Sequence, residues 1–447
     1  MSDLYCYFGS NWGGKAEGES ILDIFYKYNI AFAGLDTEEV NNCKNKFKAG
    51  TKIAVSDGMT VKAVGIAEED FDSLDNLKID FLPEEKKRFA INKGVLAVKV
   101  KLYKLEEEDC YQEKSFRRRF SNINDYNIKK EIDERLKKYS GEEAMEKMKE
   151  EIKELLMQNR NLILTGAPGT GKTYLAKNIA SQIILNKDYD ESVENDINFK
   201  EQCAFVQFHP SYDYTDFVEG LRPKNDNGNI GFERKDGVFK EFCKEALNNQ
   251  SSNFVFIIDE INRGEISKIF GELFFSVDSG YRGEKGKVQT QYANLIEDGD
   301  EFKDGFYIPE NVYIIGTMND IDRSVESMDF AMRRRFAWKE IKAKDTQNML
   351  DEYKWENKID ADIIQSAKEK MNKLNEAISN TPELSDAYNI GASYFLKLNN
   401  YYKDNNKQEA FKKLWENHLN IILFEYTRGM PNQKDIIDKL KKEIIEE

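Results

Sequence analysis

Several residue types and patterns are scarce in this chain of 447 residues, and each scarcity excludes a class of protein. With only 2 histidines, a histidine-rich metal centre is excluded. The cysteines are widely spaced and form no C-x-x-C pair, which argues against a zinc knuckle or a disulfide framework. Reduced thiols fit a cytosolic protein best, so we expect a cytoplasmic location. The cysteines are Cys6, Cys43, Cys110, Cys203 and Cys243.

Long apolar segments are also lacking. The longest runs, such as Phe254 to Ile258, contain about five residues, whereas a membrane-spanning helix needs about 20. The first residues carry neither a basic region nor a long apolar stretch, so we do not expect a signal peptide. The sequence therefore predicts no membrane partner.

The chain has fewer basic than acidic residues: 66 Lys and Arg against 81 Asp and Glu, which gives a formal net charge of −15. A protein that coats nucleic acid over its whole surface needs a dense Lys/Arg face. Any DNA contact must then be confined to a local basic patch. The run from Lys114 to Arg119 is one candidate, and it fits either a solvated helix face or a contact with nucleic acid or a partner.

Length and composition predict two or three folded domains, since 40% of the residues are hydrophobic. Residues 1–108 alternate between strand and helix patterns typical of a small α+β or barrel-like module. Residues 109–158 are highly charged and predict a helical connector. In residues 159–343, short apolar strands alternate with helices, which indicates a parallel sheet covered on both faces. Residues 344–447 predict a helical domain. The expected core strands are 162–164, 204–208, 254–258, 312–315 and 336–341.

One motif carries a specific chemistry. The segment from Gly166 to Thr173 matches G-x-x-x-x-G-K-[ST] after a buried strand and before a helix, as a phosphate-binding loop requires. Glycines let the backbone wrap a phosphate chain, and the loop N–H groups attract anions. Lys172 is expected to reach the β- and γ-phosphates and Thr173 to hold Mg²⁺. The candidate nucleotide-binding residues are Gly166, Pro168, Gly169, Thr170, Gly171, Lys172 and Thr173, together with Asp259.

Polar side chains also follow two other strands and precede a third. Asp259 and Glu260 end an apolar strand, at the positions where a P-loop enzyme places its Mg²⁺-orienting acid and its water-polarising group. Asn319 follows the next strand and could orient the same water. The run from Arg333 to Arg335 precedes the last strand, and an arginine there could reach the γ-phosphate of a neighbouring subunit.

These motifs, in this order and followed by a helical lid, resemble an AAA+ ATPase-type module. The flanking segments resemble McrB-type proteins, the GTP-dependent motor subunits of modification-dependent DNA restriction systems. The matching segments are Phe208 to Pro223, Asp259 to Arg263, Thr317 to Ser324, Met328 to Phe336 and Tyr388 to Phe395. In the third of these, Asp320-Ile321 replaces the Thr-Ala of the family signature M-N-T-A-D-R-S.

The resemblance implies a homo-oligomeric ring, usually a hexamer, with nucleotide between subunits. Lys172, Thr173, Asp259, Glu260 and Asn319 would act within one subunit, whereas Arg333 and Arg334 would act on the neighbour's nucleotide. It also implies GTP rather than ATP, Mg²⁺, and a McrC-like nuclease subunit that stimulates hydrolysis through the signature around Asn319 and Asp322. In such proteins the N-terminal domain reads DNA, often through a modified base flipped into an aromatic pocket.

Two questions stay open. The N-terminal layout weakly resembles PUA- or EVE-like barrels, and the aromatic residues Tyr5, Tyr7, Trp12, Phe25 and Phe32 fit either a base pocket or the hydrophobic core. The rival family is that of the MoxR-like protein-remodelling chaperones, whose N-terminal module would bind protein. Those proteins carry an arginine in the lid where this chain has Tyr394-Phe395, which favours the McrB-type interpretation.

Overall fold

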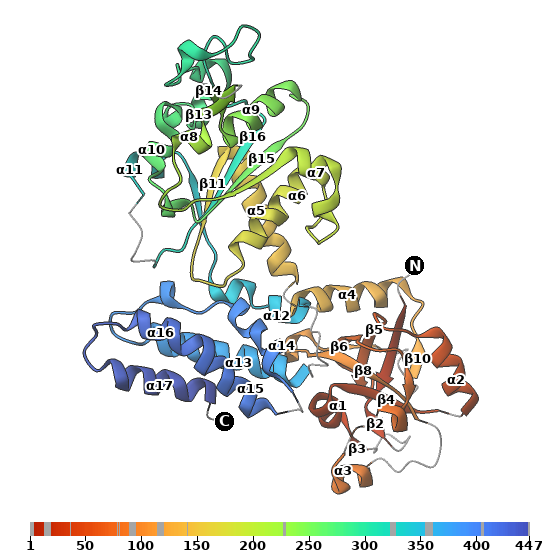
Figure 1. Cartoon of the computed structure of the whole chain (residues 1–447). Helices are drawn as coiled ribbons and strands as arrows, with labels where there is room; N and C mark the ends of the chain where they lie inside the picture. The colour runs from red at the N-terminus through yellow and green to blue at the C-terminus, as the bar shows by residue number, and fades with distance from the viewer. Residues whose placement is uncertain are drawn as a thin grey trace. The chain divides into compact units, whose positions relative to one another are not determined.

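The computed structural model describes most of the chain (Figure 1). The described residues are 4–12, 19–35, 37–77, 79, 81–88, 95–113, 120–140, 142–226, 229–321, 328–353, 361–403 and 406–445. The basic run from 114 to 119 and the position of Asp322, both singled out above, lie outside these residues.

The chain divides into two units. The first comprises Met1–Ala144 with Lys358–Ser366, and the second comprises Met145–Asn357 with Ala367–Glu447. The division therefore falls inside the segment expected to be a helical connector. That expectation is wrong for its first part, because Tyr111–Gln112 and Phe120–Asn122 are strands of the N-terminal sheet. Short polar strands of this kind carry too little apolar alternation to be recognised in the sequence.

The N-terminal unit is built on a mixed sheet, so the expected α+β module is present. The strands follow the order β10-β1-β5-β6-β8-β4, with β7 paired to β8 and β9 to β6, and the pairing among the described strands does not close into a barrel. The strands are β1 (Tyr5–Gly9), β4 (Ile30–Gly34), β5 (Lys52–Asp57), β6 (Thr60–Ala67), β7 (Asp72–Ser73), β8 (Val95–Lys104), β9 (Tyr111–Gln112) and β10 (Phe120–Asn122); β2 (Asn11–Trp12) and β3 (Glu19–Ser20) form a separate pair. The helices are α1 (Leu22–Tyr28), α2 (Thr37–Lys46), α3 (Pro83–Arg88) and α4 (Tyr126–Ser140).

The described N-terminal aromatic residues form hydrophobic core. Tyr5 and Tyr7 alternate with Cys6 and Phe8 along β1, so the tyrosines pack with residues of α4 while Phe8 packs with Phe25 and Phe32 on the other face of the sheet. Each of the four candidates is at most 5% exposed. The interpretation of these four as a base pocket is therefore wrong. The side chain of Trp12 lies outside the described residues.

The second unit contains a parallel sheet of five strands in the order β12-β15-β16-β11-β17. The strands are β11 (Asn161–Thr165), β12 (Cys203–Gln207), β15 (Phe254–Asp259), β16 (Val312–Thr317) and β17 (Ala337–Glu340), which confirms the five expected core strands to within a few residues. Because all five run in the same direction, their carboxyl ends meet at one edge. That edge carries every polar strand end singled out in the sequence.

Helices cover both faces of this sheet (Figure 1). Successive strand residues alternate between two cores: Phe254, Phe256 and Ile258 face one side, whereas Val255 and Ile257 face the other. This explains why the strand reads as an unbroken apolar run. The helices on the first side are α8 (Tyr214–Phe217), α9 (Val238–Asn248) and α10 (Ile266–Phe270), and on the second side α5 (Glu142–Asn159), α6 (Lys172–Leu185) and α7 (Ile197–Gln202).

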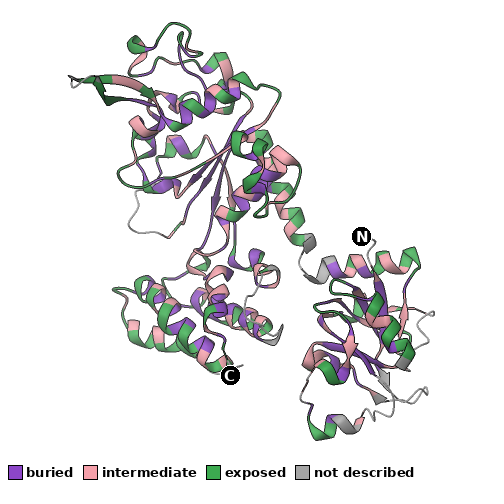
Figure 2. Cartoon of the chain, turned by 45° about the vertical axis from the view of Figure 1, so that its right-hand side comes forward, coloured by how far each residue is buried: buried purple, intermediate pink, exposed green. Residues whose placement is uncertain are grey.

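A hairpin that the sequence did not predict connects α8 to α9. Its strands, β13 (Glu219–Asp226) and β14 (Asn229–Asp236), pair with each other and with no other strand in the described part of the chain, and much of the hairpin is exposed (Figure 2). Its base is held by buried charges: Lys240 on α9 contacts Glu219 at 2.6 Å, and both side chains are fully buried. Arg234 bonds the same carboxylate at 3.0 Å. The hairpin is therefore anchored rigidly where it leaves the domain.

The C-terminal part of the second unit is helical, as expected, with no strand among its described residues. Its helices are α12 (Met349–Glu352), α13 (Ala361–Ser379), α14 (Leu398–Tyr401), α15 (Lys407–Leu414), a π-helical turn (Trp415–Leu419), α16 (Asn420–Tyr426) and α17 (Gln433–Ile445). Across the described residues of the whole chain, no helix combines the length and the apolar character that crossing a membrane requires.

Candidate functional site: the carboxyl edge of the parallel sheet

The phosphate-binding loop connects β11 to α6, as the motif predicted. Gly166, Gly169 and Gly171 all have positive φ, at 135°, 78° and 78°. At Gly169 a side chain would also have no space, because its Cβ would lie 2.6 Å from Ser393 Oγ. Thr170 is fully buried and donates its hydroxyl to the carbonyl of Ala167 at 3.0 Å. The loop therefore has one tightly determined shape that depends on glycine.

Lys172, Asn319 and Glu260 form a continuous hydrogen-bonded chain. The Lys172 ammonium donates to Asn319 Oδ1 at 2.8 Å, and Asn319 Nδ2 donates to Glu260 Oε1 at 2.7 Å. Lys172 is 7% exposed. Burial lowers the pKa of Lys172 to about 8, although the neighbouring carboxylates, of which Glu260 acts most strongly, favour its charged form. The candidate phosphate-binding cation, amide and base thus lie together, although they are far apart in the sequence.

A second group of oxygen atoms lies at the foot of the same loop. Thr173 Oγ1 donates to Asp259 Oδ1 at 2.7 Å, and Thr317 Oγ1 donates to the same oxygen at 2.7 Å. Hydroxyl and carboxylate oxygens are the hard ligands that Mg²⁺ prefers, with substrate phosphates completing its coordination. Thr173 and Asp259 therefore fit a Mg²⁺ site, in which both side chains would be ligands.

The backbone at Glu260 is unusual, because φ is +52° in a residue other than glycine. Such left-handed conformations cost on the order of 1–3 kcal/mol and cluster at functional sites. The conformation is supported on both sides: the Glu260 N–H donates to Thr317 Oγ1 at 3.3 Å, and Arg263 Nε donates to Glu260 Oε2 at 3.1 Å. The carboxylate is held in one orientation, toward Asn319.

The three arginines before β17 point in different directions. Arg333 ends α11 (Phe330–Arg333) and is exposed, as is Arg334. The guanidinium of Arg333 lies over the ring of Trp338, 5.2 Å from its centroid. Arg335 is partly buried, with its guanidinium 4.2 Å from the ring centroid of Phe274. Of these three arginines, Arg333 and Arg334 are therefore the ones placed to reach another molecule.

Sequence reasoning assigned no role to Thr317 or Arg263, although both are in direct contact with the acidic pair. The signal for Thr317 was available, since it is a polar residue at the end of an otherwise apolar buried strand. Arg263 follows Glu260 by three residues across a short helical turn, Ile261–Arg263, and only the structure shows that turn. Among the described residues, no group of three or more His, Cys, Asp or Glu side chains could hold a metal ion.

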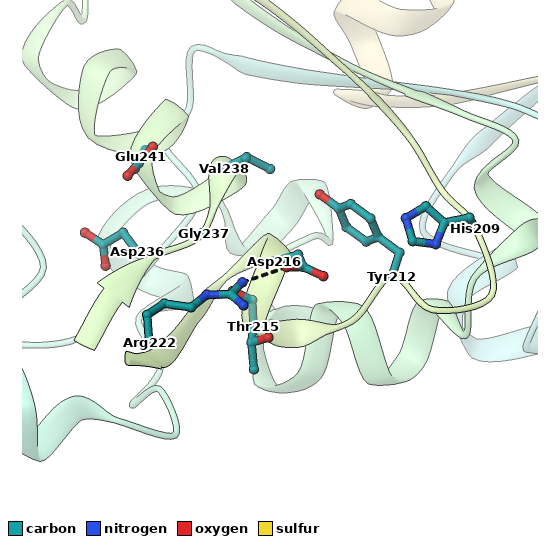
Figure 3. Close-up of a pocket in the computed structure, with 9 residues that line it drawn as sticks. All are labelled: His209, Tyr212, Thr215, Asp216, Arg222, Asp236, Gly237, Val238 and Glu241. Atoms are coloured by element: carbon teal, nitrogen blue, oxygen red, sulfur yellow. Dashed lines mark hydrogen bonds and ion pairs between the residues drawn. The ribbon is translucent and has the colours of Figure 1, made fainter. Parts of the chain in front are cut away.

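A separate pocket of about 430 Å³ lies at the base of the hairpin (Figure 3). It contains no residue of the phosphate-binding loop. Its most defined feature is an ion pair between Arg222 Nη2 and Asp216 Oδ1 at 2.6 Å, across from the rings of His209 and Tyr212. The segment from Phe208 to Pro223, which resembles McrB-type proteins in sequence, therefore forms part of the hairpin base and of this pocket. The lining residues are His209, Tyr212, Thr215, Asp216, Arg222, Asp236, Gly237, Val238 and Glu241.

Comparison with known proteins agrees with this geometry. Residues 161–336 match the family model described as AAA domain (dynein-related subfamily). Over 247 residues, 55% of this chain, the sequence is 38% identical to the type IV methyl-directed restriction enzyme EcoKMcrB subunit of Escherichia coli (strain K12). Over 231 residues, 45% of this chain, it is 26% identical to the type II restriction enzyme BsuMI component YdiS of Bacillus subtilis (strain 168). The expected AAA+ fold is confirmed.

The extent of these matches is partial. The chain spans 49% of the length of the first relative and 64% of the second. Among solved structures, a putative ATPase from Cytophaga hutchinsonii aligns with 70% of this chain and 90% of its own, at 13% identity and a TM-score of 0.28, which is too low to support an inference.

Proposed function

We propose that this chain is the nucleotide-hydrolysing motor subunit of a McrBC-like DNA restriction complex, because it contains an AAA domain and is similar in sequence to subunits of restriction enzymes. The observation that carries the proposal is the pair of hydrogen bonds that connects Lys172 to Asn319 and Asn319 to Glu260. It joins the phosphate-binding cation to the candidate base, within a domain whose described relatives belong to restriction enzymes.

Each of the residues at this edge of the sheet has a separate role in the proposed hydrolysis. The loop N–H groups and Lys172 bind the phosphates. Thr173 and Asp259 would hold Mg²⁺, which supplies neutralising charge to the β- and γ-phosphate oxygens. Glu260 orients the attacking water and accepts its proton, and Asn319 keeps the Glu260 carboxylate facing the phosphate. Arg263 donates to Glu260 Oε2 and Asn319 donates to Glu260 Oε1, so the carboxylate is held in one orientation.

The exposed arginines supply the argument for a ring. Arg333 and Arg334 lie on the surface, and an arginine from a neighbour that stabilises the transferring phosphoryl group is worth on the order of 10³–10⁵ in rate. We propose that these two residues act on the nucleotide of the adjacent subunit in a homo-oligomer, most simply a hexamer. Asp322, beside the Asn319 signature, would take part in stimulation by the partner subunit.

Glu260→Gln tests the assignment of the base. The amide keeps the hydrogen bond with Asn319 but cannot accept a proton, so we expect nucleotide binding within about threefold of wild type and hydrolysis reduced at least a hundredfold. Glu245→Gln, an exposed glutamate on α9, is the matched control and should leave both unchanged. Normal turnover in Glu260→Gln would refute the assignment.

The remaining parts of the proposal are separable. We propose GTP over ATP, a McrC-like subunit that brings the nuclease, and DNA recognition by the N-terminal unit. Turnover with each nucleotide, with and without the co-encoded partner, tests the first two. Gel shifts of the full chain with modified and unmodified duplexes at low salt, where phosphate contacts are strongest, test the third. Absence of any shift at low salt would remove DNA recognition from the proposal.

A further inference from the structure

The helical C-terminal part of the second unit, called the lid below, contacts the phosphate-binding loop through backbone atoms. The N–H of Gly391 donates to the carbonyl of Pro168 at 3.0 Å, and the N–H of Ser393 donates to the carbonyl of Gly169 at 3.1 Å. The two preceding loop carbonyls, of Gly166 and Ala167, accept from the Lys172 ammonium at 2.9 and 2.8 Å. Four consecutive loop carbonyls, from Gly166 to Gly169, thus each accept a hydrogen bond, two from the Lys172 side chain and two from the lid.

These contacts orient the groups that bind phosphate. A trans peptide is planar, and its C=O and N–H point in opposite directions. The carbonyl of Pro168 shares a peptide with the N–H of Gly169, and the carbonyl of Gly169 shares one with the N–H of Thr170. When the lid holds the two carbonyls, it also sets the direction in which those two N–H groups point.

The lid segment is itself held in place. Asn375 on α13 forms two hydrogen bonds with the backbone of Ile390: its amide donates to the Ile390 carbonyl at 3.0 Å and accepts from the Ile390 N–H at 2.7 Å. The side chain of Asn375 is buried, as is Ile390. The next residue, Gly391, lies so close to the loop that a Cβ would fall 2.1 Å from Gly169 C and 2.4 Å from Thr170 N. These are backbone atoms of the loop, so they have little freedom to move aside.

We infer that the lid segment Ile390–Phe395 senses the nucleotide through the backbone of the phosphate-binding loop, with Gly391 and Asn375 as positioning residues. An anion that accepts from the Gly169 and Thr170 N–H groups polarises the same two peptides and strengthens the lid's bonds to their carbonyls. By linkage, a lid that is docked on the loop tightens nucleotide binding by the same factor. This inference depends on the proposed nucleotide binding at the loop.

Hydrogen exchange of the wild-type full chain provides the first test. On adding GTP or ATP with Mg²⁺, we expect amides in the loop and in residues 388–396 of the lid to slow together. Slowing in the loop without any change in the lid would overturn the inference while leaving the proposed function intact. No change in either segment would mean that nucleotide does not bind, and the proposed function would fail with the inference.

Gly391→Ala provides the second test. The new methyl group must separate the lid from the loop, so we expect nucleotide affinity to fall about tenfold or more and the nucleotide-dependent slowing in the lid to disappear, while slowing in the loop persists at saturating nucleotide. Gly231→Ala is the control, because its Cβ would have no neighbour closer than 4.0 Å. Asn375→Leu, which removes both bonds to Ile390, should reproduce the effect. Wild-type affinity together with nucleotide-dependent lid protection in both variants would overturn the inference.

Discussion

The buried ion pair at the base of the hairpin allows a quantitative prediction. The substitution Lys240→Met keeps a side chain of similar length with an apolar stem. It removes the ammonium that lies 2.6 Å from the Glu219 carboxylate, and Glu219 remains fully buried. Breaking a buried pair on one side costs about 3–5 kcal/mol. Glu219 keeps Arg234 at 3.0 Å and the N–H of Tyr292 at 3.0 Å, so we expect the lower end, about 3 kcal/mol.

Urea unfolding measures this cost directly. With a slope of about 3 kcal/mol per M, the midpoint of the second unit should fall by about 1 M. Lys224→Met is the control on the same hairpin. Its ion pair with Glu233, at 3.2 Å, is largely exposed to solvent, so its loss should leave the midpoint almost unchanged. The double variant Glu219→Gln/Lys240→Met should recover part of the loss, because no buried charge remains unpaired. A midpoint for Lys240→Met equal to that of Lys224→Met would refute the reasoning.

Three further outcomes are expected. Because burial lowers the pKa of Lys172 to about 8, its side chain is about half charged at that pH and loses most of its charge by pH 9.5. Nucleotide affinity should therefore fall as pH rises from 8 to 9.5, and a Kd that stays constant over this range would contradict this. Burial alone would raise the pKa of Glu219, but the hydrogen bond from Lys240 brings the pKa below its usual value. The stabilisation from this bond is present above about pH 4.3 and is lost as the pH falls through the lower pKa of the folded state. The wild type should therefore lose more stability between pH 5 and 3 than the Glu219→Gln/Lys240→Met variant. Arg333→Ala and Glu260→Gln should each be inactive alone, yet a mixture should regain turnover if Arg333 acts on a neighbour, and a mixture without activity would place Arg333 within its own subunit.

Local patterns were sufficient for the elements whose function depends on short spacing. The phosphate-binding loop could be recognised because its glycines, Lys172 and Thr173 lie within eight residues and begin a helix. The core strands could be recognised because both of their faces are buried, which leaves unbroken apolar runs. The acidic pair at the end of β15 followed from the same pattern.

Features that depend on distant residues could not be read in this way. β9, β10 and the hairpin are short or polar, and their pairing or anchoring relies on residues elsewhere in the chain, so periodicity gave no signal for them. The aromatic residues of β1 illustrate the same limit: the sequence shows that Tyr5 and Tyr7 alternate with Phe8, but only packing against α4 shows that both faces of the strand are core.

By itself, the sequence determined the sheet, the phosphate-binding loop and the identity of the polar strand ends. The tertiary structure decided which of those ends meet. Asn319 touches both Lys172 and Glu260 because β11, β15 and β16 are neighbours in one parallel sheet and end at the same edge. The lid reaches the loop because Gly391 has no side chain where the two backbones approach. Both are consequences of which strands and loops lie side by side, and the spacing of residues along a chain does not encode that adjacency locally.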